Sequence, residues 1–389
     1  MSSACTFLLT FLVSVLCGLT CGQLAQNLTP LDIGVRCAQY PRTPTVLTFV
    51  VDQPDANLLL LHFDFVKLMP QDTLTLRAVV NHTVGAVIDT LTSATTAPFY
   101  SVPMYTLLVV LELHVVMGLG RSGPANATTR CFGFHVDGVR TSAIDGNKAA
   151  SADESICGTD DSKNAQCFVN SAMYTASKAV VRLLTNRVGG SAFCTGWLLG
   201  CEGHLLTNEH CIQDATDAGN TLIEFMAEGV SCGTNCDSQM ACAATPRLYT
   251  RGATFIAAST ELDYSIVKLD PAMIPEGLGF LRLRLAGPAL NEKVYIPQHP
   301  LGWGKHVAVM AGLAPGMITT VTLAGCAVDQ AGYMLDTQPG SSGSPVLSVR
   351  DNNVVALHHC GGCPNAGIQS QKLIQDFAKR GILPQCSVA

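Results

Sequence analysis

The residues with the clearest chemical potential lie in the segment Asp336-Thr-Gln-Pro-Gly-Ser-Ser-Gly-Ser-Pro-Val346. Glycines on both sides of the serine pair allow the backbone to turn sharply and to aim its N–H groups at a substrate carbonyl. Acyl transfer needs such donors, because they stabilise the oxyanion that develops in the transition state. We therefore predict Ser342 as a nucleophile, with the N–H groups of Gly340 and Ser342 as its oxyanion hole. The alternative is a Gly/Ser-rich surface turn without chemistry.

A candidate general base lies upstream, where an apolar strand runs into Thr207-Asn-Glu-His-Cys211. A histidine next to a disulfide cysteine is held rigidly, as proton transfer at a fixed position requires. Most isolated histidines are surface or core residues, but the combination with the serine motif favours a catalytic His210.

A candidate carboxylate opens the alternating apolar strand in Glu261-Leu-Asp-Tyr-Ser-Ile-Val-Lys-Leu269. From this position Asp263 can reach inward, orient an imidazole and stabilise its protonated form. Asp270, at the other end of the strand, competes for this role. We prefer Asp263 because it precedes the apolar run.

Together, and in this order, the three segments resemble the signature motifs of trypsin-like serine peptidases, over roughly residues 171–386. The resemblance implies a chymotrypsin-like double β-barrel, each barrel of six strands, with the active site between them. It also implies that His210 acts as base and then acid, that Asp263 orients it and that Ser342 attacks. Cys194 and Cys211 match the disulfide that this family has beside the histidine.

The sequence departs from animal digestive members of this family. They have an aspartate directly before the serine, which pairs with a new N-terminal amine on activation, whereas Ser341 stands here. No Arg/Lys-Ile-Val-Gly-Gly start is present, so we do not expect activation by that ion pair. The Gly-Ser-Ser-Gly-Ser-Pro form and the segment His359-Cys-Gly-Gly-Cys-Pro-Asn365 look closer to glutamyl and lysyl endopeptidases.

Substrate preference has two interpretations. Asp336 lies where trypsin-like members place the carboxylate that binds Arg or Lys, which slightly favours a basic substrate residue. Thr337 and His359 instead match positions that glutamyl endopeptidases use for an acidic side chain. In a third interpretation Asp336 and His359 are structural residues. Asp336 then accepts hydrogen bonds from the backbone at the end of a strand, and His359 packs under the pocket.

Composition predicts a compact, secreted, all-β protein. Of 389 residues 48% are apolar and 13% charged, and the net charge of −6 provides no basic face for nucleic acid. The run Phe7–Leu16 has the length of a signal-peptide core, with cleavage expected near Gly22. Removal of the leader after Gly22 leaves 14 of the 17 cysteines, an even number that suits disulfides in a secreted chain. Glycosylation sequons at Asn27, Asn81 and Asn126 agree with this interpretation.

The predicted organisation is a signal peptide (1–22), a β-sandwich-like N-terminal domain (23–139), a linker (140–170) and the protease domain (171–389). Alternating runs such as Leu61–Phe65 and Asp72–Val80 favour the sandwich, which Cys37 and Cys131 could staple. Cys157 and Cys167 could close a loop in the linker. A terminal helix is expected over Ser370–Arg380.

We predict a secreted serine endopeptidase that needs no cofactor or metal and acts on protein or peptide substrates. The alternative function is a catalytically silent homologue that binds a protein or inhibitor. The N-terminal domain is either a pro-region or a module that binds a glycan or protein. The apolar run 105–120 is too short to span a membrane. Zinc ligation by Cys232, Cys236, Cys242 and the Cys360/Cys363 pair beside His358 is disfavoured against disulfides.

Overall fold

The computed structural model of the chain describes residues 28–54, 56, 58–80, 83–116, 131–142, 155–187 and 190–389. The predicted signal peptide and the sequon asparagines Asn27, Asn81 and Asn126 lie outside these residues. Within the described ranges, no helix combines the length and apolar character needed to cross a bilayer.

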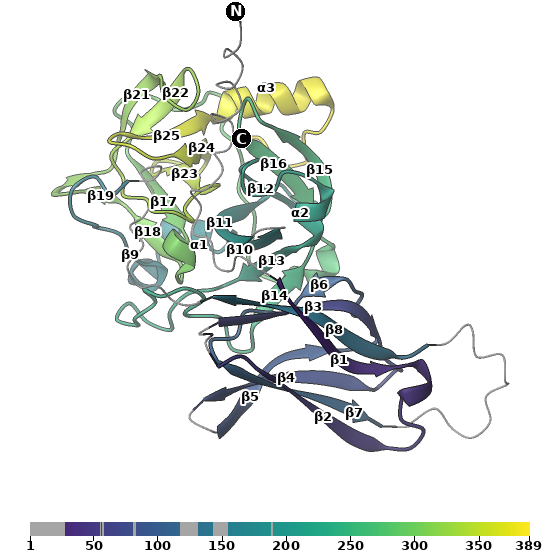
Figure 1. Cartoon of the computed structure of the whole chain (residues 1–389). Helices are drawn as coiled ribbons and strands as arrows, with labels where there is room; N and C mark the ends of the chain where they lie inside the picture. Colours follow the sequence, from purple (N-terminus) through teal and green to yellow (C-terminus); the bar gives the residue numbers. More distant parts are fainter. Residues whose placement is uncertain are drawn as a thin grey trace, which may run out of the picture.

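The N-terminal part is a sandwich of two four-stranded antiparallel sheets, with orders β1-β8-β3-β6 and β2-β7-β4-β5 (Figure 1). Leu, Val and Phe side chains on the inner faces form its core. A disulfide between Cys37 and Cys131 joins the end of β1 to the start of β8, as the sequence suggested. The strands are β1 (Leu28–Arg36), β2 (Thr45–Asp52), β3 (Leu58–Lys67), β4 (Thr73–Val80), β5 (Thr83–Leu91), β6 (Phe99–Tyr100), β7 (Leu108–Val115) and β8 (Gly133–Ser142).

The first barrel is a sheet of order β14-β13-β10-β11-β12-β16-β15. Its two end strands, β14 (Leu248–Arg251) and β15 (Thr254–Ser259), are separated by two residues only, so they are halves of one strand bent at Gly252 and the sheet closes. Six strands therefore form the barrel, as the resemblance implied. The others are β10 (Val180–Arg187), β11 (Gly190–Leu199), β12 (His204–Thr207), β13 (Thr221–Phe225) and β16 (Tyr264–Lys268); the short helices α1 (Ala172–Ser177) and α2 (Ala215–Gly219) flank them.

The second barrel has the order β21-β22-β25-β24-β23-β17-β18-β9. Backbone bonds from Val294 N–H to Gly316 and from Ile318 N–H to Glu292 tie β17 to the chain entering β21, which closes it. Its strands are β17 (Val294–Gln298), β18 (His306–Ala308), β21 (Ile318–Leu323), β22 (Gln330–Tyr333), β23 (Pro345–Ser348), β24 (Val354–Cys360) and β25 (Asn365–Gln369), with the hairpin β19 (Met310–Ala311) and β20 (Ala314–Pro315). The all-β, double-barrel prediction is thus confirmed.

Part of the predicted linker belongs to this second barrel. The edge strand β9 (Lys163–Asn164) pairs with β18, and Ala165 N–H continues the pairing to the carbonyl of Lys305. Within the predicted linker 140–170, the backbone groups of residues 163–165 are thus bonded within the sheet.

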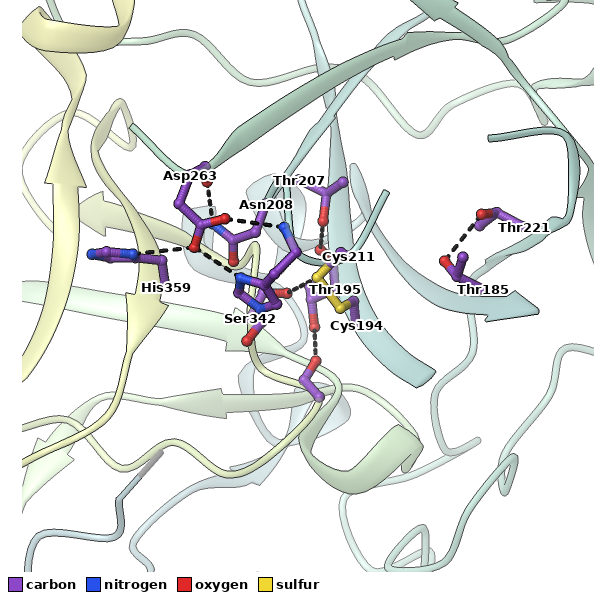
Figure 2. The surroundings of a disulfide bond; sticks show 12 residues. Thr185, Cys194, Thr195, Thr207, Asn208, Cys211, Thr221, Asp263, Ser342 and His359 are labelled. Carbon is purple, nitrogen blue, oxygen red and sulfur yellow. Dashed lines mark hydrogen bonds and ion pairs between the residues drawn. A yellow bond between two sulfur atoms is a disulfide. The ribbon is translucent and has the colours of Figure 1, made fainter. Parts of the chain in front are cut away.

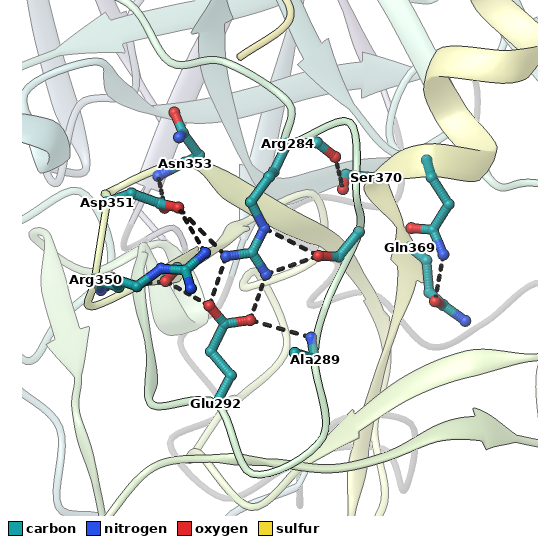
Figure 3. A network of polar contacts seen from close by, with 11 residues as sticks. Arg284, Ala289, Glu292, Arg350, Asp351, Asn353, Gln369 and Ser370 are labelled. Atoms are coloured by element: carbon teal, nitrogen blue, oxygen red, sulfur yellow. Dashed lines mark hydrogen bonds and ion pairs between the residues drawn. The ribbon is translucent and has the colours of Figure 1, made fainter.

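The C-terminal helix α3 (Ser370–Arg380) confirms the predicted helix and packs Phe377 against Tyr264 of β16 in the first barrel. Leu373, Ile374 and Phe377 form its buried face, and Gly381 ends it in the left-handed conformation. A buried arginine connects this region to the barrel: Arg284 bonds both oxygens of Glu292, and its carbonyl accepts from Ser370 at the helix start (Figure 3).

The sandwich packs on the first barrel near β13 and β14 (Figure 1). A cluster of buried apolar side chains crosses this interface, with Leu58, Leu60 and Val102 from the sandwich against Leu184, Phe193, Leu222 and Met240. Asp89 of β5, fully buried, forms an ion pair with Arg251 and accepts from Tyr249 Oη at 2.5 Å. Apolar burial and a buried ion pair make this a fixed contact between the two units.

Seven disulfides use all 14 cysteines that follow the predicted leader. The proposed Cys157–Cys167 loop is wrong: Cys157 pairs with Cys363 and Cys167 with Cys232, because the chain around each runs along the protease barrels. The cysteines weighed as zinc ligands are all in disulfides. The remaining pairs are Cys194–Cys211, Cys201–Cys386, Cys236–Cys242 and Cys326–Cys360.

Candidate active site

A histidine and an aspartate from the first barrel meet at its edge. His210 Nδ1 lies 2.8 Å from Asp263 Oδ2, and the His210 backbone N–H donates to Oδ1 at 3.1 Å. The carboxylate therefore fixes both the ring and the main chain of the histidine. With Nδ1–H bonded to Asp263, Nε2 is the nitrogen left to accept a proton.

The turn between β15 and β16 places Asp263. The residue adopts φ +40, and its carbonyl accepts from Asn208 Nδ2 at 2.7 Å. Asn208 comes from the same Thr-Asn-Glu-His segment as His210, so this motif holds the aspartate as well as the base. The competing Asp270 is exposed and accepts from Ala272 N–H at 3.0 Å, capping a short turn.

A second imidazole also contacts Asp263. His359 Nδ1 lies 3.2 Å from Oδ2 (Figure 2). Its Nε2 lies 3.0 Å from Gln330 Oε1. Burial disfavours the charged carboxylate, but hydrogen bonds and charge from His210 and His359 outweigh it and hold the pKa of Asp263 well below its usual value. Sequence reasoning assigned His359 to substrate binding and missed this contact with the aspartate.

The loop that carries Ser342 is held against the first barrel. The Ser342 carbonyl accepts from Thr195 N–H at 2.9 Å and lies 3.9 Å from Cys211 Sγ, the residue after His210. Thr195 Oγ1 also donates to the Gly340 carbonyl at 2.8 Å. The disulfide Cys194–Cys211, present as the resemblance implied, joins β11, which carries Thr195, to the turn that carries His210 (Figure 2).

Two glycines of this loop are required by its conformation. Gly340 has φ +100 and Gly343 has φ +86, in the region that side chains rarely adopt. A Cβ at Gly343 would lie 2.2 Å from the Thr195 carbonyl oxygen, and one at Gly340 would lie 2.9 Å from that of His299. The close approach of the loop to β11 and to the 299–302 turn therefore excludes larger residues.

The predicted specificity residues have different surroundings. Both carboxylate oxygens of Asp336 accept backbone N–H groups, from Cys157 at 2.9 Å and Asp161 at 2.8 Å. The side chain is nearly fully buried, and this burial raises the pKa of Asp336. Thr337 Oγ1 is buried without a partner.

His358, the neighbour of His359, is also buried and has one nitrogen without a partner. Its Nδ1 lies 2.7 Å from Tyr333 Oη, and its Nε2 is unpaired. Burial, with the charges of His359 and His210, lowers the pKa of His358 to about 3, so the ring is neutral near neutral pH. The sequence could have pointed to His358, because it directly precedes His359, which was predicted for substrate binding.

One cluster in the described part of the chain has metal-ligand atoms within 4.8 Å of one another, formed by Cys194, His210 and Cys211. Both sulfurs are joined in a disulfide, so they offer no thiolate. The cluster follows from the disulfide beside the histidine.

Comparison with known proteins places this site in a family. Residues 194–357 match the family described as "Trypsin-like peptidase domain". Over 368 residues the chain is 41% identical to "Secreted RxLR effector protein 73" from Plasmopara viticola, covering 91% of this chain and 89% of that protein.

Three solved structures with a similar fold are each at most 19% identical to this chain. An HtrA-type protease with a tripeptide has 19% identity over 56% of this chain and 62% of its own, with a TM-score of 0.39, so this chain spans less than two thirds of it. The serine endoprotease from Yersinia pestis has 16% identity over 55% of this chain and 68% of its own, with a TM-score of 0.39. A Glu endopeptidase has 17% identity, and the match covers 59% of this chain and 99% of the endopeptidase chain, with a TM-score of 0.40. The effector has much higher identity and matches nearly the whole chain. This chain therefore belongs to that protein's family, and its second half contains a trypsin-like peptidase domain.

Proposed function

We propose that the protein is a secreted serine endopeptidase in which Ser342 is the nucleophile, His210 the general base and Asp263 its orienting carboxylate. The observation that carries the proposal is the 2.8 Å contact between His210 Nδ1 and Asp263 Oδ2, which commits Nε2 to proton transfer. Ser342 attacks the scissile carbonyl, and its proton passes to His210. That proton then goes to the leaving amine, and water hydrolyses the acyl-enzyme.

The proposed oxyanion hole is formed by the backbone N–H groups of Gly340 and Ser342. The left-handed Gly340 supports this assignment, because its conformation turns the peptide planes of the loop. Preorganised donors of this kind contribute about 100- to 1000-fold to the acylation rate.

For the residue before the scissile bond, we propose an acidic side chain recognised by Thr337 and His358. Asp336 is disfavoured as a binder of Arg or Lys, because both its oxygens already accept backbone N–H groups. His359 is disfavoured because its two nitrogens face Asp263 and Gln330. Thr337 Oγ1 and His358 Nε2 are buried and unpaired, so a substrate carboxylate would give them the partners they lack.

The N-terminal sandwich is proposed to remain with the protease as a binding module for a glycan or protein. The buried Asp89–Arg251 pair and the apolar interface support this, since a released pro-region would expose them to water. A secreted form that lacks residues before about 165 would overturn it.

The test of the proposed chemistry is labelling of the folded protein with a fluorophosphonate probe. We expect one label per chain, lost in Ser342→Ala and retained in the exposed-serine control Ser231→Ala. Absence of labelling in the wild type would reject the enzyme. It would favour the second candidate, a catalytically silent protein that acts by binding, which the effector name of its relative motivates.

The substrate preference is tested with a peptide library and mass spectrometry. Cleavage after Glu or Asp supports recognition of the substrate by Thr337 and His358, and His358→Ala should then lose the preference. Cleavage after Lys or Arg would restore Asp336 as the substrate-binding residue.

A further inference from the structure

Residues 155–161, here called the strap, run from the interdomain segment across the chain that leads to Ser342. Its backbone N–H groups at Cys157 and Asp161 donate to the two oxygens of Asp336, at 2.9 and 2.8 Å. A single carboxylate thus binds the strap at two points four residues apart. The pairing crosses a sequence separation of more than 170 residues, so it is a tertiary contact.

The strap also bonds the two residues that follow this carboxylate, and Asn365. The Ser155 carbonyl accepts from Thr337 N–H at 3.2 Å and from Asn365 Nδ2 at 2.8 Å. Asp160 Oδ2 accepts from Gln338 Nε2 at 2.9 Å. Three consecutive residues of the catalytic loop, 336 to 338, therefore each have a bond to the strap.

A covalent link completes the attachment. The disulfide Cys157–Cys363 joins the strap to the turn between β24 and β25, and Asp161 Oδ2 accepts from Gly312 N–H at 2.8 Å. The strap then continues into β9, which is an edge strand of the same barrel. It is held at both ends and cannot leave with the sandwich.

The segment between the strap and Ser342 is a tight turn with its own internal bonds. Ser341 N–H donates to the Gln338 carbonyl at 2.8 Å, and Gln338 N–H donates to Ser341 Oγ at 3.1 Å. Ser341 is fully buried and carries no charge, so it has no attraction for a free amine. The catalytic loop is fixed by the strap at Gln338 and by Thr195 at Gly340 and Ser342.

We propose that the strap and Asp336 position the catalytic loop, so that the peptidase is competent without a new N-terminus. This proposal rests on the proposed function and gives Asp336 the part of a positioning residue that does not touch substrate. The strap belongs to the same chain and is already bonded, so the loop needs no cleavage event to take its shape.

The first test is Asp336→Asn in the full chain. The amide keeps the side-chain shape but offers one acceptor where two backbone N–H groups need one each. We expect the labelling rate with a fluorophosphonate and kcat on peptides to fall about 100-fold, the effect of a misplaced catalytic group. The fall should be equal for substrates with acidic, basic and neutral residues before the scissile bond. A selective loss of Lys/Arg substrates with unchanged labelling would overturn the proposal and make Asp336 a substrate ligand.

The second test removes the covalent link with the double substitution Cys157→Ser and Cys363→Ser. We expect about a tenfold slower labelling rate, because the hydrogen bonds of the strap remain. The matched control, Cys37→Ser with Cys131→Ser, removes the sandwich disulfide and should label at the wild-type rate. Equal rates in both variants would contradict the positioning role.

The third test needs no substitution and asks whether a free N-terminus matters. A full chain with its α-amine acetylated should label as fast as the unblocked protein. If labelling appears only after cleavage between the domains, the proposal is overturned while the proposed function stands. If the unblocked, uncut and cut wild-type proteins all fail to label, the proposed function itself has failed.

Discussion

The contact between His359 and Asp263 leads to a prediction that separates a positioning role from a substrate-binding role. The perturbation is His359→Ala, which removes the imidazole whose Nδ1 lies 3.2 Å from Asp263 Oδ2. It also leaves Gln330 Oε1 without its 3.0 Å partner. Asp263 keeps its two contacts with His210, at 2.8 and 3.1 Å.

The size of the effect follows from what is lost and what remains. A hydrogen bond to a charged group contributes about 1.5–3 kcal/mol. The lower figure applies, because 3.2 Å is long for such a bond and the remaining contacts still orient His210. At about 1.4 kcal/mol per factor of ten, kcat/KM should fall roughly tenfold. The orphaned Gln330 oxygen should lower the free energy of unfolding by about 1–3 kcal/mol.

The assay is kcat/KM for a set of peptides that differ only in the residue before the scissile bond, with unfolding measured in parallel. We expect the same loss for every peptide in His359→Ala. His359→Asn should recover part of it, since an amide Nδ2 can donate to Asp263 from nearly the same place. The matched control is His358→Ala, which should change the preference among peptides. If His359→Ala changed the preference and left the other rates intact, His359 would be a pocket residue and the reasoning refuted.

Three further outcomes are expected. Asp263→Asn should lower kcat about 10⁴-fold, because Nδ1 of His210 then loses the acceptor that fixes its tautomer; steady-state peptide hydrolysis would measure it, and a loss under tenfold would contradict it. Burial alone would raise the pKa of Glu292. The hydrogen bond from Arg284 more than offsets this effect and lowers the pKa from 4.5 to about 2. Its stabilisation is therefore complete above pH 4.5 and lost as the pH falls to about 2; the difference in unfolding free energy between wild type and Glu292→Gln, about 2 kcal/mol after allowance for solvent, should narrow over that window in urea titrations. Asp89→Ala should cost about 3–5 kcal/mol by leaving Arg251 charged and unpaired at the domain interface, and a change in urea midpoint worth under 1 kcal/mol would contradict a fixed interface.

The parts of the fold and site that could be predicted are those encoded in local patterns. Alternating runs indicated strands, and the lysine and arginine at the end of α3, followed by Gly381, are a typical helix terminus. The three motifs around His210, Asp263 and Ser342 could be aligned because each combines a reactive side chain with the turn or strand that presents it. Family resemblance then supplied the double barrel.

The long-range contacts could not be predicted, because no local pattern encodes them. The partners of Asp336 lie 175 and 179 positions upstream, in a stretch whose polar composition indicated a linker. The same composition suits a strap, since its backbone groups bond the barrel and its side chains need not be apolar. Cys157 was paired with its neighbour in sequence for the same reason, whereas its partner is Cys363, 206 positions away.

His358 and His359 are adjacent in the sequence but have different contacts. Neighbouring residues on a regular strand point to opposite faces, so His358 and His359 are not expected to contact the catalytic aspartate together. Which one does so depends on the phase of β24, and the pairing with β25 shifts register between His358 and Cys360. A one-residue irregularity exchanges the two faces, and no residue type in the motif reports it. The disulfide Cys326–Cys360 anchors the strand just beyond this shift, so that His359 meets Asp263 while His358 bonds Tyr333. The motif match predicted His359 for substrate binding, one position from His358. The hydrogen bonds of the two rings distinguish their roles.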